Sequence, residues 1–455
     1  MTLTEILSNY FVDKQYDDLP QKVADKAKEN VIDTLAGAIP AVVLPDVAGV
    51  RQAYKSKYDK QDDCVLWGTK EKASVLTAAI INGTTAHALE MDDFHPQGKC
   101  HMGIGILPTV LCLGEVNHIT GKEALMAIVA GYEVGLRVAI SVGTASHRLR
   151  GWHATCTCGV FGAAMAAAKV LKLNEKQMVS ALGLAGTQAS GLWAFMQDGA
   201  GNKKFHGGHA AECGVNAAII ASGGLTGPSY ILEATDGGFF KAVSDNYDCD
   251  RVVTGLGENW DVMKVGRKPY ACCRSMHLSI DGILELREKE HLKIEDIEKI
   301  DVFTYEIGVK QCGVFLVPKN KFEAAFSIPY GIAVALEDGV AGISQFSEER
   351  IKDEKLLNFC RKITVVAVPK YTGEYPKNWG CEMHIYLKNG RKLEKTVWNG
   401  KGSADNPLTK DDLILKFKSL AGQRMDNAQM DKIINAIYDL DKCNDIAEFT
   451  KLLSC

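Results

Sequence analysis

The stretch Ala163-Ala-Met-Ala-Ala-Ala168 places five alanines within one helix-like segment in the first half of the chain. Small side chains at successive helical positions let neighbouring helices approach closely, so this stretch indicates a core of tightly packed helices. Ala217-Ala218 repeats the feature further along. Helical periodicity is clearest over residues 21–39, 73–88, 121–142, 158–171, 175–189 and 209–221. The first part of the chain is therefore predicted to be a bulky all-helical domain.

Helix start signals support this prediction. Asn174 precedes Glu175-Lys-Gln177, and Thr120 precedes Gly121-Lys-Glu123, so each has an N-cap residue followed by a capping-box side chain. Helical periodicity returns between Leu408 and Leu453, with Thr409 as the expected N-cap.

The pattern changes at about residue 266. Apolar and polar residues alternate in 300–305, 363–368 and 382–387, which predicts three strands. Lys388-Asn-Gly-Arg391 contains the Asn-Gly pair of a tight hairpin, so residues 393–398 are expected to form the partner strand. Helices are expected between the strands, at 278–290 and 329–336.

The whole chain is thus predicted to be mainly α, with two domains. Residues 1–265 form the helical domain, residues 266–404 form a smaller α+β lid domain, and the helices of 405–455 pack back on the first domain. A length of 455 residues agrees with this division, because a single core stops growing at about 250–300 residues.

Composition excludes several functional classes. Hydrophobic residues make up 46% and charged residues 24%, and the net charge of −4 offers no general basic surface for nucleic acid. Residues 1–10 lack the basic and apolar regions of a secretory signal, and no apolar run is expected to reach the about 18–20 residues of a membrane helix. We therefore expect a cytoplasmic protein without a membrane or nucleic-acid partner.

The cysteines raise the alternative of a zinc enzyme. Fourteen cysteines are spread thinly through the chain, which is typical of reduced thiols. Cys156-Thr-Cys158 and Cys272-Cys273 lack the paired C-x2-C spacing of a strong zinc motif. We expect no metal and no cofactor, and a zinc enzyme using Cys156, Cys158 and the histidines stays as an alternative.

Ten of the eleven histidines lie between His87 and His291, and the densest cluster is His87-Ala-Leu-Glu-Met-Asp-Asp-Phe-His-Pro-Gln-Gly-Lys-Cys-His101. Three carboxylates and three imidazoles within fifteen residues favour a proton-transfer site, because closely placed titratable groups shift one another's pKa. The alternative interpretation is the polar end of a helix.

A second polar segment, Gly199 to His209, combines glycines with Lys203 and Lys204 before a predicted helix. Glycines expose backbone amides, and a helix N-terminus favours an anion, so the segment is typical of carboxylate binding. A phosphate loop is disfavoured because the G-x-x-x-x-G-K-[ST] pattern is absent.

A third segment, Gly266 to His277, contains Lys268, Cys273 and Arg274 at the predicted domain boundary. Arginine and lysine together can bind a carboxylate, and a cysteine or histidine can exchange a proton. A structural hinge is the other interpretation, and both can hold because ligand sites favour domain interfaces.

Two isolated residues complete the candidates. His153 lies in Gly151-Trp-His-Ala-Thr155 just before a helix, where capping gives no reason for an imidazole. Tyr330, in Ser327-Ile-Pro-Tyr330, places a phenol at a helix start, and structural and catalytic interpretations are equally open.

Taken together, these motifs resemble the MmgE/PrpD family, which includes 2-methylcitrate dehydratase, cis-aconitate decarboxylase and iminodisuccinate epimerase. The resemblance extends over most of the chain. Its motifs are His87 to Asp93, Gly151 to Thr155, Lys203 to His206, Leu225 to Pro228, Lys268 to His277, Ser327 to Tyr330 and Asn406-Pro407. It implies a helical domain with an α+β lid, a homodimer, and an interdomain site without metal or organic cofactor that takes a small polycarboxylate.

The resemblance also implies roles for individual residues. The catalytic candidates are Asp92, Asp93, His101, His153, Lys203, Lys268, Cys273, His277 and Tyr330. The candidates for substrate binding are Lys204, His206 and Arg274.

Two departures from the family pattern bear on the reaction. Cys273 stands about where cis-aconitate decarboxylases have a catalytic histidine, and Phe94 stands where they have a threonine. The sequence therefore predicts a lyase like 2-methylcitrate dehydratase, which breaks a C–H bond next to a carboxylate. The alternatives are an epimerase like iminodisuccinate epimerase, for which a thiol is suited, a cis-aconitate decarboxylase, and a non-catalytic carboxylate-binding protein.

Overall fold

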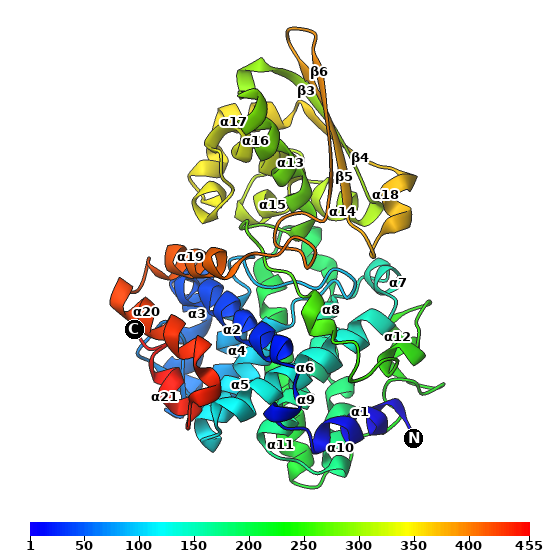
Figure 1. Ribbon diagram of the computed structural model, residues 1–455, viewed down its shortest axis with the longest axis vertical. Helices are drawn as coiled ribbons and strands as arrows, with labels where there is room; N and C mark the ends of the chain where they lie inside the picture. Colours follow the sequence, from blue (N-terminus) through cyan, green and yellow to red (C-terminus); the bar gives the residue numbers. More distant parts are fainter.

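The computed structural model describes all 455 residues and shows a broad helical part below a narrower part that contains the main sheet (Figure 1). The first helices of the helical part are α1 (Leu3–Val12), α2 (Gln21–Ala41), α3 (Pro45–Ala53), α4 (Val75–Ala86), α5 (Gly103–Asn117) and α6 (Gly121–Ser141). They are followed by α7 (Thr144–Leu149), α8 (Ala154–Thr157), α9 (Gly159–Val170), α10 (Glu175–Thr187), α11 (Phe205–Ser222) and α12 (Phe239–Val243). A two-stranded ribbon, β1 (Cys64–Val65) and β2 (Lys72–Ala73), lies between α3 and α4.

The upper part, called the sheet part below, carries the remaining strands and six helices. Its strands are β3 (Ile297–Thr304), β4 (Ile363–Ala367), β5 (Gly380–Leu387) and β6 (Lys392–Trp398). Its helices are α13 (Arg274–Glu290), α14 (Glu306–Cys312), α15 (Lys321–Ala325), α16 (Ile328–Asp338), α17 (Glu354–Cys360) and α18 (Pro369–Glu374). The predicted fold class, mainly helical with a smaller α+β region, is confirmed.

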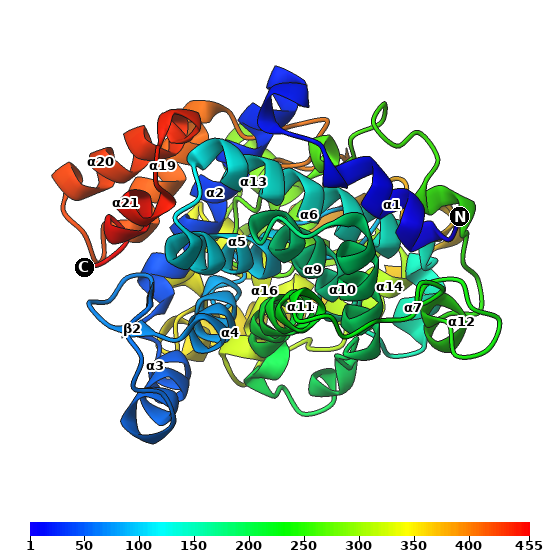
Figure 2. The ribbon, with the colours of Figure 1, turned by 90° about the horizontal axis from the view of Figure 1, so that it is seen from below.

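The centre of the helical part is held together by small residues, as the alanine-rich stretch predicts. α9 packs between α6 and α11, and Figure 2 shows α11 end-on among its neighbours. A methyl group on Gly162 would lie 2.7 Å from the backbone oxygen of Gly131, and one on Gly214 would lie 2.3 Å from the Ala163 side chain. Larger residues would therefore force these helices apart.

The predicted helix starts are also confirmed. Thr120 accepts a hydrogen bond from the Glu123 amide, and Asn174 accepts one from the Gln177 amide, each within a complete capping box. Thr409 caps α19 (Lys410–Ala421) in the same way.

The main sheet is mixed, with strand order β4-β3-β5-β6. β3 pairs with β4 in parallel and with β5 in antiparallel register, and β5 and β6 form the expected hairpin. Gly390 in its turn has a φ of 85°, which favours glycine. Buried and exposed residues alternate along these strands because α13 covers only one face.

The C-terminal helices α19, α20 (Asn427–Tyr438) and α21 (Ile446–Lys451) return to the helical part (Figure 1). α19 packs on α2, and α21 packs on α5. The Lys416 ammonium reaches into this contact, 2.6 Å from an Asp33 carboxylate oxygen and 2.6 Å from the carbonyl of Met91. The C-terminal helices thus stabilise the segment that carries the histidine-rich loop.

Two helices that adjoin the predicted polar segments differ from expectation. α5 forms over the Gly-rich stretch after His101, where no helix was expected, and α11 begins at Phe205, four residues earlier than predicted. The glycines of α5 serve close packing, because a methyl group on Gly103 would lie 2.6 Å from both Thr34 Oγ1 and the Tyr132 hydroxyl. Burial outweighs the low helix propensity of glycine here.

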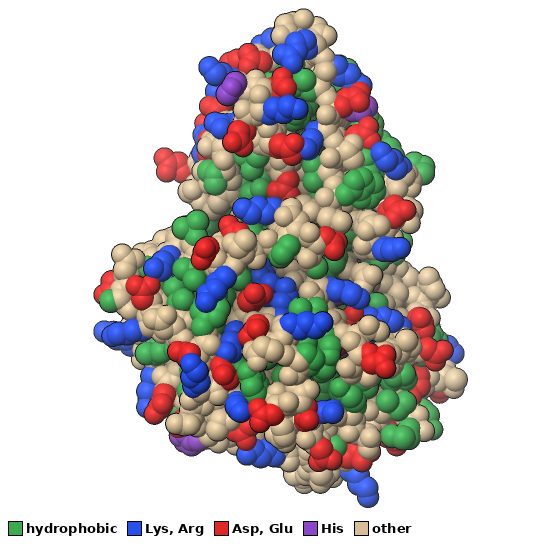
Figure 3. Space-filling model, in the orientation of Figure 1, with side chains coloured by type: hydrophobic (Ala, Val, Ile, Leu, Met, Phe, Trp, Pro, Cys, Tyr) green, Lys and Arg blue, Asp and Glu red, His purple; other side chains and the backbone are tan.

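The expectation that no apolar run reaches membrane-spanning length is wrong for one helix. α6 is long and apolar enough by length and composition, and 94% of its most apolar window is buried inside the protein. The face shown in Figure 3 mixes acidic and basic side chains, in keeping with the small net charge.

Candidate active site

The histidine-rich loop and the Gly266–His277 segment meet where the two parts of the molecule join. Phe94 and Gly266 exchange backbone hydrogen bonds of 3.0 and 2.8 Å. A methyl group on Gly266 would lie 2.4 Å from the Phe94 ring, so glycine permits this close approach. The bridge brings Lys268, Cys273 and Arg274 over the loop that ends at His101.

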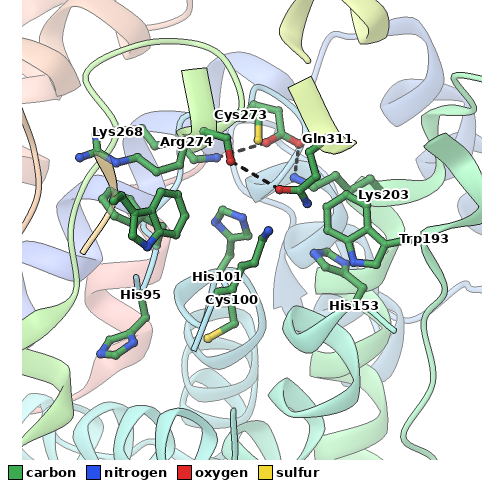
Figure 4. A pocket seen from close by; sticks show the side chains of 15 residues that line it. His95, Cys100, His101, His153, Trp193, Lys203, Lys268, Cys273, Arg274 and Gln311 are labelled. Carbon is green, nitrogen blue, oxygen red and sulfur yellow. Dashed lines mark hydrogen bonds and ion pairs between the residues drawn. The ribbon is translucent and has the colours of Figure 1, made fainter. Parts of the chain in front are cut away.

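A small cavity of about 30 Å³ lies at this junction. Figure 4 shows Cys273, Arg274 and Gln311 above it and His101 and His153 below it. Six predicted site residues line it: His101, His153, Lys203, Lys268, Cys273 and Arg274. The lining also contains Glu90, Lys99, Trp193 and Gln311, which the sequence interpretation did not single out. The cavity is therefore lined by four basic side chains and one carboxylate.

His101 is held in one orientation. Its Nδ1 lies 2.5 Å from the backbone oxygen of Asp93 and 3.0 Å from Asp92 Oδ2, so this nitrogen carries the proton. Burial and the nearby Lys268 ammonium lower the pKa of His101. The imidazole is therefore neutral near pH 7, and its Nε2 is free to accept a proton.

Asp92 lies just behind the cavity and orients the groups in front of it. Its Oδ1 is 3.0 Å from His87 Nδ1 and 3.8 Å from Lys268 Nζ. Burial alone would raise the pKa of Asp92, but His87, Lys268 and His101 together hold it well below its ordinary value. Asp92 is therefore an ionised positioning group without direct access to the cavity.

Glu90 joins the two lysines that face the cavity. Its carboxylate is 2.5 Å from Lys203 Nζ and 3.2 Å from Lys268 Nζ. Burial opposes ionisation, but the two ammonium groups outweigh it and lower the pKa of Glu90, while Asp92 and Glu90 raise that of Lys268. Glu90 also has a φ of 55°, which is unfavourable for a non-glycine residue.

Cys273 presents its thiol to the cavity from the start of α13. An interaction with the Cys312 thiol lowers the pKa of Cys273 to about 6, against the opposing effect of burial. A thiol with this pKa exchanges protons readily near neutral pH.

His153 and His206 form a hydrogen-bonded pair at one wall of the cavity. Their Nδ1 atoms are 2.8 Å apart, so one ring donates and the other accepts. Burial lowers the pKa of both, that of His206 to about 4, and both are neutral near pH 7. His153 lines the cavity edge-on to Trp193, and the predicted binding residue His206 contacts the cavity only through His153.

Besides Asp92, three predicted catalytic residues lie outside the cavity lining. Asp93 accepts hydrogen bonds from the Tyr132 hydroxyl and the Gly103 amide, and burial raises its pKa to about 7. The Tyr330 hydroxyl donates to the Gln345 carbonyl. His277 contacts Arg274 and the Cys272 carbonyl. These side chains do not line the cavity, and their catalytic roles stay predictions.

The two remaining candidates for substrate binding, Arg274 and Lys204, make contacts with other groups of the protein. Arg274 donates to the carbonyls of Gly400 and Lys401 and stacks 4.4 Å over the Phe94 ring, so it anchors the chain while lining the cavity. Lys204 pairs with Asp46 in a larger outer cavity of about 470 Å³. Glu90 and Lys203 line both cavities and separate them.

One group of side chains has the composition of a metal site. Ligand atoms of His87, Asp92 and His101 lie within 4.8 Å of one another, and no cysteine belongs to the group. The Lys268 ammonium already lies 3.8 Å from Asp92 and would repel a cation placed there. The donor set therefore suits an internal ion pair better than a metal ion, and Cys156 and Cys158 form no zinc cluster.

Comparison with known proteins identifies the family. Residues 5–251 match the MmgE/PrpD N-terminal domain, and residues 270–440 match the MmgE/PrpD C-terminal domain. The chain belongs to the MmgE/PrpD family. The resemblance predicted from the motifs is confirmed, and this MmgE/PrpD protein is an enzyme of a family that acts on carboxylic acids.

Relatives that match along almost their whole length have names that specify a reaction. A cis-aconitate decarboxylase from Aspergillus terreus is 27% identical over 463 residues, which cover 96% of this chain and 93% of the relative. The Homo sapiens cis-aconitate decarboxylase is 25% identical over 447 residues, covering 96% of this chain and 91% of the relative. This MmgE/PrpD chain is thus similar to decarboxylases along its whole length.

Proposed function

We propose that this protein is a cofactor-free lyase that removes a proton from the carbon next to a carboxylate of a small di- or tricarboxylic acid. The observation that carries the proposal is His101, a neutral imidazole with one fixed tautomer, facing a cavity lined by four cations and one carboxylate. A polyanionic substrate balances these charges, and the free Nε2 is the base.

Charge develops on the substrate when the C–H bond breaks. Lys203 and Lys268 face the cavity from the two parts of the molecule and stabilise the resulting enolate-like anion. A preorganised donor of this kind is worth on the order of 10²–10³ in rate. Their ion pairs with Glu90 and Asp92 hold both lysine side chains in place until substrate arrives.

The second proton-transfer group decides the reaction. Cys273 lies across the cavity from His101, so the two groups address opposite faces of a bound acid (Figure 4). Loss of hydroxide from the neighbouring carbon gives a dehydratase. Reprotonation from the opposite face gives an epimerase, and loss of CO2 followed by protonation gives a decarboxylase.

Dehydration is our first candidate. Phe94 and Cys273 both line the cavity, so the two departures from the decarboxylase pattern alter the reacting surface itself. Decarboxylation is the second candidate, and the names of the full-length relatives favour it. Epimerisation is the third candidate, because the Cys273 thiol lies across the cavity from the His101 imidazole.

Proton NMR in D2O tests the proposal. EDTA-treated protein is incubated separately with 2-methylcitrate, citrate, cis-aconitate and iminodisuccinate. Deuterium at the carbon next to a carboxylate with a new alkene signal supports the dehydratase, exchange without net product supports the epimerase, and CO2 release from cis-aconitate supports the decarboxylase. Binding of these acids without any exchange would favour a non-catalytic carboxylate-binding protein and contradict the proposal.

A further inference from the structure

Lys99 is a buried lysine without a carboxylate partner. Its Nζ is buried and has no hydrogen-bond partner. Burial and the Arg148 guanidinium lower the pKa of Lys99 to about 7. Leaving a charge unpaired inside a protein is costly, so such a group points to a missing anion.

Other donors without hydrogen-bond partners lie near Lys99 or along the same cavity. Lys99 Nζ lies 5.3 Å from the centre of the Tyr375 ring, and the Tyr375 hydroxyl has no partner. Gln311 lines the same cavity with its Nε2 unpartnered, because only its Oε1 is engaged, by the Ser275 hydroxyl. Arg148, whose Nε is also unpartnered, stacks 4.1 Å over Trp193 at the cavity wall.

The backbone conformation of Lys99 also indicates a functional position. Lys99 has a φ of 47°, a conformation that non-glycine residues rarely adopt. The turn that imposes it is closed by backbone hydrogen bonds between His95 and Cys100 and between Lys99 and His95. Strain of this kind persists where the surrounding structure fixes a side chain in a functional position.

Lys203 and Lys268 differ from Lys99 because both already form ion pairs with Glu90. We propose that Lys99, with Gln311, Tyr375 and Arg148, forms a second anion subsite that binds a carboxylate of the substrate remote from the reacting carbon. The inference rests on the proposed function and assigns a binding place to the second carboxylate of the acid. One carboxylate is placed by Lys99 while the carbon next to another faces His101.

Equilibrium binding tests the subsite independently of turnover. Isothermal titration calorimetry compares glutarate with pentanoate, in which a methyl group replaces one carboxylate, on the wild type, Lys99→Met and the control Lys377→Met. Lys377 is exposed on the sheet part. We expect the wild type to bind glutarate at least about tenfold more tightly than pentanoate, and Lys99→Met to lose that preference while binding pentanoate unchanged.

Folding is checked with the same variants. Replacing a buried lysine that has no hydrogen-bond partner by methionine should leave the melting temperature of the ligand-free protein equal or higher, and the rise caused by glutarate should shrink. An unchanged preference for glutarate over pentanoate in Lys99→Met would overturn the subsite, and so would an equal loss of affinity for both acids. If the wild type still exchanges carbon-bound hydrogen for deuterium when the subsite is overturned, the proposed function stands without it.

Discussion

The carboxylate of Glu90 forms ion pairs with two lysines that reach the cavity from different parts of the molecule. Lys203 comes from the turn before α11, and Lys268 comes from the segment that leads into α13. The charge of Glu90 therefore keeps the cavity intact before an anionic substrate binds.

Removing this charge should make the protein dependent on an anion. We expect Glu90→Gln to lower the melting temperature, because breaking a buried ion network costs about 3–5 kcal/mol. Tricarballylate should raise the melting temperature of Glu90→Gln more than that of the wild type. Glu349→Gln, at an exposed position, serves as the control. Equal melting temperatures of the wild type and Glu90→Gln without ligand would show that the ion pairs of Glu90 do not stabilise the protein.

At single positions, residue type could be predicted from sequence but side-chain direction could not. His101 was singled out because imidazoles and carboxylates crowd one loop, and the structure places it in the cavity. Tyr330 was singled out for its phenol, but its hydroxyl turns to the Gln345 carbonyl. Glu90 lay unremarked beside Asp92 because its partner Lys203 is more than a hundred residues away.

Among the elements, the bridge between Phe94 and Gly266 couples the histidine-rich loop to α13. It holds the cationic residues of the sheet part over His101. The contact depends on glycine, because a methyl group at residue 266 would also lie 2.6 Å from the Gly402 carbonyl.

Gly266→Ala should therefore impair both stability and turnover. We expect a loss of about 1–3 kcal/mol from overpacking and a lower rate of deuterium exchange, because Lys268 shifts with the chain. Gly373→Ala is the matched control, since a methyl group there meets nothing within 4 Å. Thermal unfolding and NMR exchange measure the two effects, and wild-type exchange in Gly266→Ala would show that the bridge does not position the site.

Elements with strong periodicity were predictable, and those shaped by tertiary packing were not. β3, β5 and β6 follow the alternation of apolar and polar residues because one face of the sheet is buried. α5 was missed because its glycines and Pro108 are poor helix formers on their own. They are accommodated because α5 is enclosed by α4, α9 and α11.

At the scale of the whole molecule, buried histidines make stability depend on pH. Burial lowers the pKa of seven fully or largely buried histidines below the about 6.5 of an unfolded chain. They are His87, His95, His101, His147, His153, His206 and His277. The unfolded chain thus binds more protons below about pH 6.5, and stability falls as the pH falls towards about 4.

We therefore expect the melting temperature to be lower at about pH 5 than at about pH 7. Each histidine contributes up to about 1.4 kcal/mol per pH unit in this range. Asp93 and Glu133 act in the opposite direction, because burial raises the pKa of each to about 7. His209 does so too, because hydrogen bonds with Cys213 and Glu212 raise its pKa to about 9, but these three groups are outnumbered. Thermal unfolding at the two pH values measures the balance, and equal or higher stability at the lower pH would contradict it.

The division into a helical part and a sheet part was accessible from sequence because periodicity changes near residue 266. The return of α19–α21 to the helical part was expected from their periodicity, and its anchor, the ion pair between Lys416 and Asp33, is visible only in the structure. The homodimer remains a prediction, which sedimentation analysis of the purified protein would test.

The most direct test of the central claim is the rate of carbon-bound deuterium uptake by His101→Asn, with polycarboxylate binding measured on the same sample. His118→Asn, at a largely exposed histidine, is the control. If His101 is the base, His101→Asn binds the acid with nearly wild-type affinity while exchange falls by about 10²–10⁴. Exchange at the wild-type rate by His101→Asn with intact binding would show that another group removes the proton.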